Sequence, residues 1–354
     1  MNGQRTWVKA MNKITLLHEE IERIKSITGN IASQYRSAED LEFLTDACLY
    51  AHEFPSRIRK FLNDFKMSEP TPGFCIISGY PIDEAAIGKT PSHWKYKPER
   101  SPTLEVDLFL IALGTLLGDT LGWATQQDGH IIHDILPIKE CENEQLGTGS
   151  AQTLCWHNED SFHEYRGDYI GMVCLRNPDE VATTIASIDD AQIDAEMIKL
   201  LFEPHYTIRP DESHQEKNAS DPQIIPLDPD DPRRQAYKRI QDMNQNENKV
   251  AVMYGHPQSP YIRIDPYFML RVEDNEPAQL AVENLIKSID SVLLDVVMHP
   301  GDFLFIDNYK AVHGRKPFKP RYDGTDRWLK RINITRDLRK SRSARMSYIS
   351  RVIY

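Results

Sequence analysis

Residues 156–162 read Trp-His-Asn-Glu-Asp-Ser-Phe and place an imidazole and a carboxylate two residues apart. Side chains of an extended strand alternate between its two faces, so His157 and Glu159 point the same way and Asn158 points the opposite way. A neutral imidazole and a carboxylate side by side on a strand supply two ligands of a metal site. A second histidine would complete the two-His-one-carboxylate set that holds Fe(II) and leaves coordination positions open.

The candidate for the third ligand lies far along the chain, at His313. Residues 301–308 read Gly-Asp-Phe-Leu-Phe-Ile-Asp-Asn and are followed by Val312, His313, Gly314 and Arg315. An apolar strand, a short turn and a histidine would bring His313 back across the sheet. We therefore predict that His157, Glu159 and His313 meet at one metal ion.

Composition limits the classes of function. The chain has 354 residues, of which 40% are hydrophobic and 27% charged, which is enough for a sizeable core. Its net charge of -11 argues against a nucleic-acid partner. The basic run 336–351 follows this acidic body and is interpreted as a solvated tail or tail helix. No apolar segment approaches the ~20 residues that span a bilayer, and the polar N-terminus shows no secretory signal.

Cysteine usage predicts a reducing compartment. Five cysteines without CxxC spacing are typical of free thiols in a cytoplasmic protein; they are Cys48, Cys75, Cys141, Cys155 and Cys174.

The chain order predicts a helical N-terminal part, residues 1–70, packed on a catalytic domain, residues 71–354, as one structural unit. Helical spacing of apolar residues marks segments 14–27, 38–51, 55–65, 104–121, 190–202 and 276–297. Short strands with polar turns mark segments 74–78, 169–175, 182–188, 250–254, 261–264 and 328–335. Residues 208–248 are polar without a clear period and are interpreted as a lid over a site. Many short strands favour a barrel or jelly roll with helical additions.

An arginine follows the second histidine at a fixed distance. Arg327 lies fourteen residues after His313 and opens the strand Arg-Trp-Leu-Lys-Arg, residues 327–331. On a neighbouring strand its planar guanidinium would bind a carboxylate held at the metal. A lone His-x-Glu or a lone histidine is a weak signal, and the combination with Arg327 is the stronger one.

These blocks resemble a known family. Residues 157–160 (His-Asn-Glu-Asp), 165–166 (Tyr-Arg), 313–315 (His-Gly-Arg) and 323–331 are similar to the clavaminate synthase-like Fe(II)/2-oxoglutarate oxygenases, which include hydroxylases of free asparagine, arginine and lysine. The resemblance covers about residues 126–339. It implies a mainly β fold, the distorted double-stranded β-helix (jelly roll), with helical additions.

The resemblance also implies roles for individual residues. His157, Glu159 and His313 would hold Fe(II), and Arg327 would bind the distal carboxylate of the co-substrate 2-oxoglutarate. Dioxygen is the second co-substrate, and no catalytic residue is expected beyond the metal centre. The remaining candidates are Thr184, as a second contact to 2-oxoglutarate or as a packing residue; Arg331, for the α-carboxylate of an amino acid; and Gln126 or Gln127 with Glu159, for its α-amino group.

Residues 263–267 (Arg-Ile-Asp-Pro-Tyr) carry the substrate prediction. Asp265 and Tyr267 would share one face of a strand. One carboxylate with a phenol suits an ammonium better than a guanidinium, which requires a fork of two acceptors. This favours free L-lysine, hydroxylated at C4. The alternative interpretation of Asp265 is a salt bridge to Arg263 or another base.

Other functions stay open at this point. Within the family the alternative is an arginine or citrulline hydroxylase, or a desaturase. A non-catalytic barrel that binds a small molecule would show a broken ligand set. A zinc hydrolase also uses two histidines and a glutamate, but Arg327 has no role there. The expected partner is a small-molecule amino acid, with no nucleic acid and no membrane, and a homo-oligomer is possible through the apolar helix 276–297.

Overall fold

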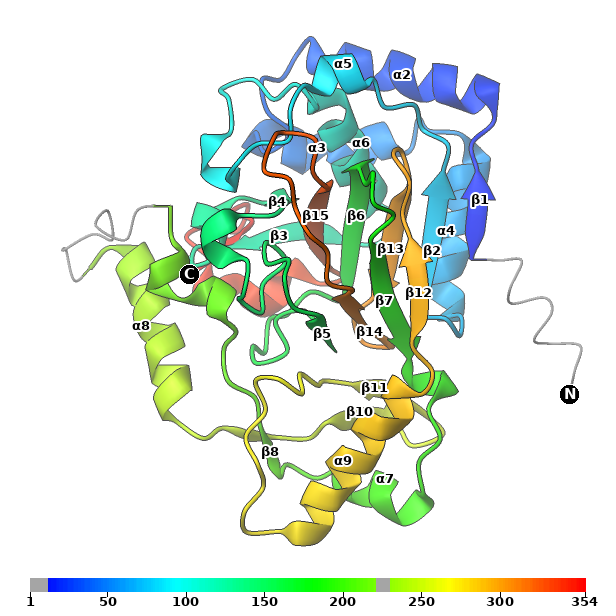
Figure 1. Ribbon diagram of the computed structural model, residues 1–354. Coiled ribbons are helices and arrows are strands. Elements are labelled where there is room, and N and C mark those ends of the chain that lie inside the picture. Colours follow the sequence, from blue (N-terminus) through cyan, green and yellow to red (C-terminus); the bar gives the residue numbers. More distant parts are fainter. Residues whose placement is uncertain (1–11, 221–229) are drawn as a thin grey trace, which may run out of the picture.

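Two β-sheets form the centre of the computed structural model, which describes residues 12–220 and 230–354 (Figure 1). The large sheet has the order β1-β2-β13-β6-β15-β3-β16, with β4 also paired to β15. The small sheet has the order β12-β7-β14-β5. The large sheet consists of β1 (Lys13–Thr15), β2 (Phe74–Ser78), β3 (Asp119–Trp123), β4 (His133–Ile135), β6 (Tyr169–Arg176), β13 (Phe303–Asp307), β15 (Trp328–Thr335) and β16 (Val352–Ile353), and the small sheet of β5 (Leu154–His157), β7 (Ala182–Ser187), β12 (Leu294–Val297) and β14 (Ala311–Arg315).

The space between the sheets is filled by side chains that alternate along each strand. On β13, Leu304 and Ile306 point to the small sheet, whereas Phe303 and Phe305 belong to the core on the other face. On β7, Ile185 lies in the inner cluster and Ala186 in the outer one. This alternation is what two stacked sheets require. The predicted double-stranded β-helix with helical additions is confirmed.

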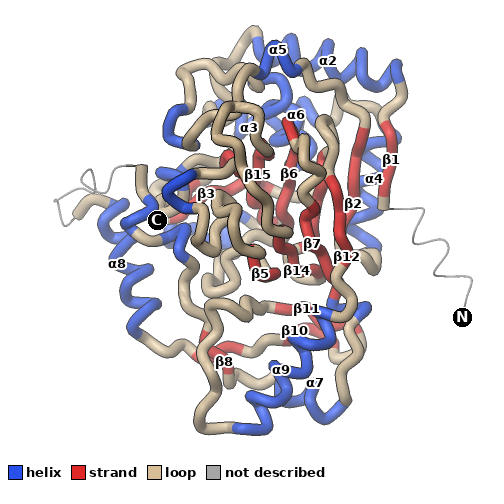
Figure 2. The backbone as a smooth tube through the Cα atoms, viewed as in Figure 1, coloured by secondary structure: helices blue, strands red, loops and turns tan. Residues whose placement is uncertain are grey.

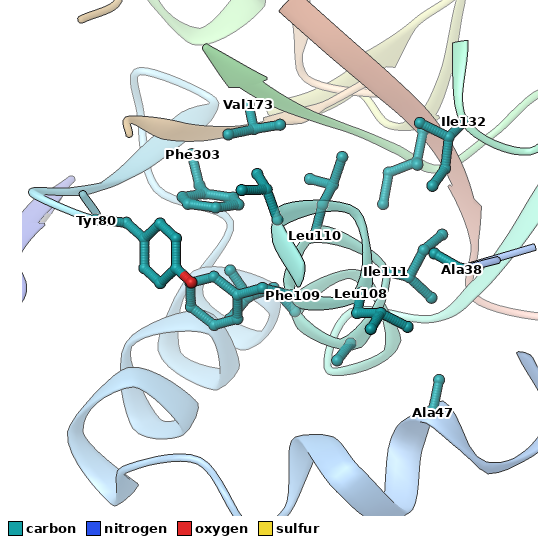
Figure 3. Close-up of a cluster of buried hydrophobic side chains, with 14 of the residues drawn as sticks. Ala38, Ala47, Tyr80, Leu108, Phe109, Leu110, Ile111, Ile132, Val173 and Phe303 are labelled. Atoms are coloured by element: carbon teal, nitrogen blue, oxygen red, sulfur yellow. The ribbon is translucent and has the colours of Figure 1, made fainter. Parts of the chain in front are cut away.

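Helices cover the outer face of the large sheet. These are α2 (His18–Ala32), α3 (Leu41–Ala51), α4 (Ser56–Ser68) and α6 (Leu104–Thr115), with the short α5 (Glu84–Ile87) beyond them. The central one is α6, which is apolar on nearly all sides, as a fully buried helix must be. Its Phe109 ring packs 4.8 Å from Phe303 of β13 and 5.2 Å from Tyr80, between ring centroids (Figure 3). The N-terminal helices and the large sheet therefore share one hydrophobic core.

A second layer covers the outer face of the small sheet. Helices α7 (Ala195–Leu201) and α9 (Glu276–Asp290) pack there with the hairpin β10 (Met253–His256) and β11 (Ser259–Ile262). The helices of both layers lie outside the strands (Figure 2). Short 3₁₀ turns complete the fold: η1 (Trp94–Tyr96), η2 (Gln127–Gly129), η3 (Lys139–Cys141), η4 (Ile188–Asp190), η5 (Glu212–His214), η6 (Glu216–Asn218) and η8 (Leu338–Ala344).

Three predicted helices were too long. Segment 104–121 ends as a helix at Thr115, because Gly118 lies against the Thr335 carbonyl and the chain turns into β3. Segment 276–297 ends at Asp290, and its last four residues form β12, which pairs with β7. Segment 190–202 is helical only from 195, where the Asp194 side chain caps the first turn. In each case an apolar run continued across a change of element.

The predicted lid contains more regular structure than its polarity indicated. Within its described part, α8 (Pro232–Gln245) is capped by Asp231, whose side chain accepts the Arg233 backbone N–H. Residues 221–229 lie outside the described residues. The insertion is flanked by the short pair β8 (Tyr206–Thr207) and β9 (Lys249–Val250). The basic run 336–351 forms η8 and a loop, and the following β16 pairs with β3. Within the described ranges, every helix is too short or too polar to span a bilayer.

Candidate active site

Two neighbouring strands of the small sheet bring the predicted metal ligands together. His313 on β14 lies directly opposite His157 at the end of β5 in the antiparallel pair. Glu159 follows two residues later, and its backbone is fixed by Asn308, whose side chain accepts from the Glu159 N–H at 2.8 Å and donates to its carbonyl at 3.0 Å. Asn158 points away and donates to the Asn308 and Ala311 carbonyls. The turn between β13 and β14 therefore holds both halves of the site in register.

The three side chains have the geometry of a metal site. Glu159 Oε2 lies 3.6 Å from His157 Nε2 and 3.5 Å from His313 Nε2, and the three ligand atoms all lie within 4.8 Å of one another. Glu159 Oε2 has no hydrogen-bond partner although it is buried. His157 Nδ1 lies 2.9 Å from the Cys155 carbonyl oxygen, which fixes the proton on Nδ1 and leaves the Nε2 lone pair free. Two imidazoles and one carboxylate with unused lone pairs fit Fe(II).

The second oxygen of Glu159 is held by Arg331 of β15. Arg331 Nη1 lies 2.5 Å from Glu159 Oε1, and its Nη2 lies 3.0 Å from His133 Nδ1. His133 Nε2 contacts the His130 carbonyl at 3.0 Å, so His133 Nδ1 is the acceptor for Arg331. Burial opposes a charge on Glu159, but Arg331 and the two imidazoles hold the pKa of Glu159 well below its ordinary value. The carboxylate is therefore ionised, as a metal ligand must be.

A cavity of about 670 Å³ opens from these side chains. All but one of the residues predicted from the sequence line it: His157, Glu159, His313, Arg327, Arg331, Gln126, Gln127, Asp265 and Tyr267. The exception is Thr184. In the pairing of β7 with β14, Thr184 lies opposite Gly314, on the face turned away from His313, whereas Thr183 lies opposite Arg315 and lines the cavity. The register therefore favours the packing role for Thr184, which was the alternative, and makes Thr183 the threonine that faces the cavity.

Two buried guanidinium groups lie at the end of the cavity next to Thr183. Arg327 and Arg315 are 5% and 3% exposed, and neither forms an ion pair with a carboxylate in residues 12–220 or 230–354, although Arg315 donates to three backbone carbonyls. Burial lowers the pKa of Arg327 to about 10 and that of Arg315 to about 9, so both are charged at neutral pH. A buried charge without a counter-ion is costly, and a dicarboxylate would supply one. Arg315 was missed as a site residue, although its place two residues after His313 puts it on the same face of the strand.

Gln126 and Gln127 differ in how many of their side-chain hydrogen bonds are already made within the protein. The Gln127 amide donates to the Asp134 carbonyl and accepts the Asp134 N–H, both at 3.0 Å, so it is used within the fold. Gln126 donates to Ser213 Oγ at 2.7 Å, and its Oε1 is buried without a partner. Gln126 is therefore the glutamine that can accept a hydrogen bond from a bound molecule.

Asp265 is not on a strand, contrary to the prediction. It lies in a turn after β11, where its Oδ1 accepts the Tyr267 and Phe268 N–H groups at 3.1 and 3.2 Å. Its side chain is buried, whereas Tyr267 is 56% exposed. A second carboxylate, Asp211, lines the same cavity from the lid. Burial, opposed by His157 and reinforced by the Asp211 charge, raises the pKa of Asp265 to about 6. The sequence indicated a polar lid over 208–248 but did not single out Asp211 or Ser213 within it.

Comparison with known proteins agrees with this geometry. The model of the taurine catabolism dioxygenase TauD, TfdA family matches residues 105–333. The chain is 42% identical to the enduracididine beta-hydroxylase of Streptomyces hygroscopicus, over 97% of this chain and 100% of the relative. It is also 42% identical to the L-ornithine/L-arginine 3-hydroxylase of Catenulispora acidiphila, again over 97% and 100%. An L-lysine 4-hydroxylase of Chitinophaga pinensis is 25% identical over 86% of this chain and 76% of the relative.

Solved structures of the non-heme iron oxygenase OrfP resemble the whole molecule. The complex with Fe, succinate and (3S)-hydroxy-L-Arg has a TM-score of 0.91 and 42% identity, covering 97% of this chain and 99% of that one. The complex with Fe and alpha-ketoglutaric acid has a TM-score of 0.85 and 41% identity, covering 97% and 100%. With the ligand set and the two buried arginines that lack a carboxylate partner, these likenesses show that the chain belongs to the TauD/TfdA family and is an Fe(II)- and 2-oxoglutarate-dependent oxygenase that acts on a free amino acid.

Proposed function

We propose that this enzyme hydroxylates C3 of a free L-amino acid with a guanidino side chain, L-arginine or a close derivative. The observation that supports this most directly is the second carboxylate: Asp211 and Asp265 line one cavity and are close enough for the charge of one to raise the pKa of the other. Two carboxylates offer the paired acceptors that a planar guanidinium prefers. The names of the 42% identical relatives point to the same side-chain chemistry and to the β-carbon.

Lysine hydroxylation at C4 has weaker support. The prediction rested on a single acid, Asp265, beside a phenol at Tyr267. The lid supplies a second acid, Asp211, which the prediction lacked. Tyr267 is 56% exposed and therefore shields a bound ammonium from solvent less than a buried residue would. The lysine 4-hydroxylase named above is also much less similar to this chain than the relatives named for arginine and ornithine. The arginine alternative is therefore the better proposal, and ornithine is the natural competitor.

The proposed roles follow from the contacts. His157, Glu159 and His313 hold Fe(II), which with 2-oxoglutarate and dioxygen supplies the oxidation that converts C–H to C–OH and releases succinate and carbon dioxide. Arg327, with Arg315 and Thr183 beside it, binds the distal carboxylate of 2-oxoglutarate. These residues position one co-substrate and give it a counter-charge in a water-poor pocket.

The amino acid is held at both ends. The terminal nitrogens of Arg331 contact Glu159 and His133, and its Nε, which is buried without a partner, binds the α-carboxylate. Gln126 Oε1 with Glu159 accepts from the α-amino group. Asp211 and Asp265 bind the far end of the side chain. Fixing both ends of a flexible molecule selects which carbon faces the metal, which is the main way that such an enzyme lowers its barrier. Anchoring the α-end at Glu159, itself a ligand, favours oxidation close to Cα, which fits the β-carbon named for the two relatives.

A substrate panel tests the proposal. Succinate release with Fe(II) and 2-oxoglutarate is measured with L-arginine, L-ornithine, L-lysine and L-citrulline at equal concentrations. We expect arginine to give the highest kcat/KM, and citrulline, which keeps the shape but loses the charge, to be at least about ten-fold poorer. Faster turnover of lysine than of arginine would refute the guanidino assignment. Succinate release that no amino acid stimulates would refute amino-acid hydroxylation itself.

A further inference from the structure

The lid begins with a short loop, residues 209–215, which runs along the cavity. Asp211 and Ser213 of this loop point into the cavity, and His214 points away from it. Asp211 and Ser213 line the cavity, and Asp211 Oδ1 accepts the Ser213 N–H at 2.8 Å. Ser213 Oγ in turn accepts from Gln126 at 2.7 Å. His214, the next residue, turns away from the cavity and is fully buried, with 0% exposure. The loop therefore offers two side chains to the site and one to the protein interior.

His214 is fixed on all sides. Its Nε2 lies 2.9 Å from Asp160 Oδ1, and its Nδ1 lies 2.8 Å from Thr125 Oγ1. The imidazole also packs edge-on against Trp123 and Phe162, with ring centroids 5.5 and 5.0 Å apart. In the described part of the lid loop no other side chain is so completely enclosed. Such a contact resists the opening of a loop that has little apolar burial of its own.

Asp160 is a rigid anchor directly attached to the metal strand. It follows Glu159, and its φ of 50° lies in the left-handed region, which a non-glycine residue adopts only when its surroundings require it. Its Oδ2 accepts from Trp123 Nε1 at 2.6 Å and lies 3.4 Å from Asn333 Nδ2. One carboxylate thus joins the segment after β5, strand β3, strand β15 and the lid.

A second metal ion is a possible alternative interpretation of this cluster, because ligand atoms of Asp160, Asp211 and His214 lie within 4.8 Å of one another. The hydrogen bonds argue against it. Both imidazole nitrogens are already used, and Asp211 Oδ1 accepts from the Ser213 N–H and hydroxyl. A cation there would have to replace these bonds, whereas the loop needs them to keep its shape.

We propose that His214 is a positioning residue: through its hydrogen bonds to Asp160 and Thr125 together it fixes lid residues 209–215, so that Asp211 and Ser213 stand at the amino-acid end of the cavity. The effect on substrate binding rests on the proposed function, since it assumes that Asp211 meets the substrate's cationic end. The effect on the loop itself does not depend on the identity of the substrate.

The test compares His214→Phe with His163→Phe. Phenylalanine keeps the ring volume and removes the hydrogen bonds of the imidazole. His163 is the matched control, because it is also buried and its ring centroid lies 4.5 Å from that of Trp123. Its Nδ1 accepts the Tyr165 backbone N–H, which lies outside the lid. Hydrogen exchange of the backbone amides 209–215 is measured without substrate, and KM is measured for L-arginine and for 2-oxoglutarate.

For His214→Phe we expect exchange in 209–215 to accelerate about ten-fold or more and KM for arginine to rise about ten-fold, which corresponds to the loss of one charge-assisted hydrogen bond. KM for 2-oxoglutarate should change less than about two-fold, and His163→Phe should leave all three quantities near their wild-type values. Unchanged exchange in 209–215 would overturn the proposal.

Two further outcomes are distinguishable. If wild type does not turn over arginine, the proposed function fails, and the exchange data still decide whether His214 fixes the loop. If His214→Phe does not fold, Thr125→Val replaces it, because this change removes only the Nδ1 partner. Faster exchange in 209–215 of Thr125→Val would then support the proposal, and wild-type exchange would overturn it.

Discussion

At the scale of single residues, the amino-acid end of the cavity is defined by two carboxylates with different environments. Asp265 is buried in a turn, and Asp211 belongs to the lid. We expect Asp211→Asn to raise KM for L-arginine about thirty-fold, since a hydrogen bond to a charged group contributes about 2 kcal/mol. Steady-state kinetics of the wild-type enzyme and of Asp211→Asn measure this change in KM.

The neighbouring acid on the same loop provides the control. Glu212 does not line the cavity and contacts Lys217 at 3.4 Å instead, so Glu212→Gln should change KM for arginine less than about two-fold. Equal KM values in Asp211→Asn and Glu212→Gln would show that Asp211 does not meet the substrate.

The raised pKa of Asp265 predicts how binding depends on pH. Burial is the main cause that raises this pKa to about 6. The carboxylate is therefore charged above pH 6 and becomes neutral below it, so attraction for a cationic side chain is present at pH 7.5 and lost toward pH 5. KM for arginine should rise over this interval, and KM for the neutral citrulline should stay nearly constant after correction for enzyme stability. Parallel profiles for the two amino acids, or the same rise in Asp265→Asn, would contradict this assignment.

At the scale of elements, the close contact between β14 and β5 places His313 opposite His157. Gly314 makes this approach possible: a Cβ there would lie 2.6 Å from the Leu154 carbonyl oxygen and 2.9 Å from Thr184 Oγ1. Gly314→Ala should therefore push β5 away, destabilise the protein by about 1–3 kcal/mol and weaken Fe(II) binding. Thermal unfolding and metal titration measure the two effects.

Gly29 is the matched glycine for this experiment. It lies in α2, and nothing lies within 4 Å of a Cβ added there. Gly29→Ala should stabilise the helix by about 0.5–1 kcal/mol and leave metal affinity unchanged. If Gly314→Ala behaved like Gly29→Ala, the tight packing of the two strands would not matter for the site.

How much the sequence could predict also differs from element to element. The period-two pattern predicted that His157 and Glu159 point the same way, and their side chains do meet, although β5 ends at His157 and the Glu159 backbone is fixed by Asn308. The choice of Thr184 came from the family resemblance, with packing as its alternative; which of two adjacent threonines faces the cavity depends on pairing register, which a single strand does not encode. The period-two pattern failed at Asp265 because the strand ended three residues earlier, at Ile262.

Other parts of the site depended on contacts between distant segments. Asp211, Ser213 and His214 come from a lid with no sequence period, and only the folded chain shows that they meet Gln126 and Asp160. Helix α8 was missed because its apolar positions are few. Arg315 was within reach of prediction, since it shares a strand face with His313.

At the scale of the whole molecule, metal binding and folding stability are linked. The three ligands come from β14 and the end of β5, so a cation that binds only the folded barrel must stabilise it. At a hundred times its dissociation constant, anaerobic Fe(II) adds about 2.7 kcal/mol, which raises Tm by roughly 4 °C for a chain of this size. Differential scanning fluorimetry with Fe(II) and with a chelator measures the shift.

The shift should vanish in His313→Ala and persist in His256→Ala. His256 is an exposed histidine on β10 and does not belong to the ligand cluster. A full shift in His313→Ala would mean that the stabilising ion binds elsewhere.

The central claim is that a metal centre built from His157, Glu159 and His313 faces C3 of a guanidino amino acid held at both ends. The most direct measurement is ¹³C NMR of uniformly labelled L-arginine after incubation with the enzyme, Fe(II), 2-oxoglutarate and dioxygen. We expect the C3 resonance to move into the range of an alcohol carbon, with one succinate formed per hydroxylated molecule. Hydroxylation at C4 or C5 instead, or succinate formed while arginine stays unchanged, would contradict this claim.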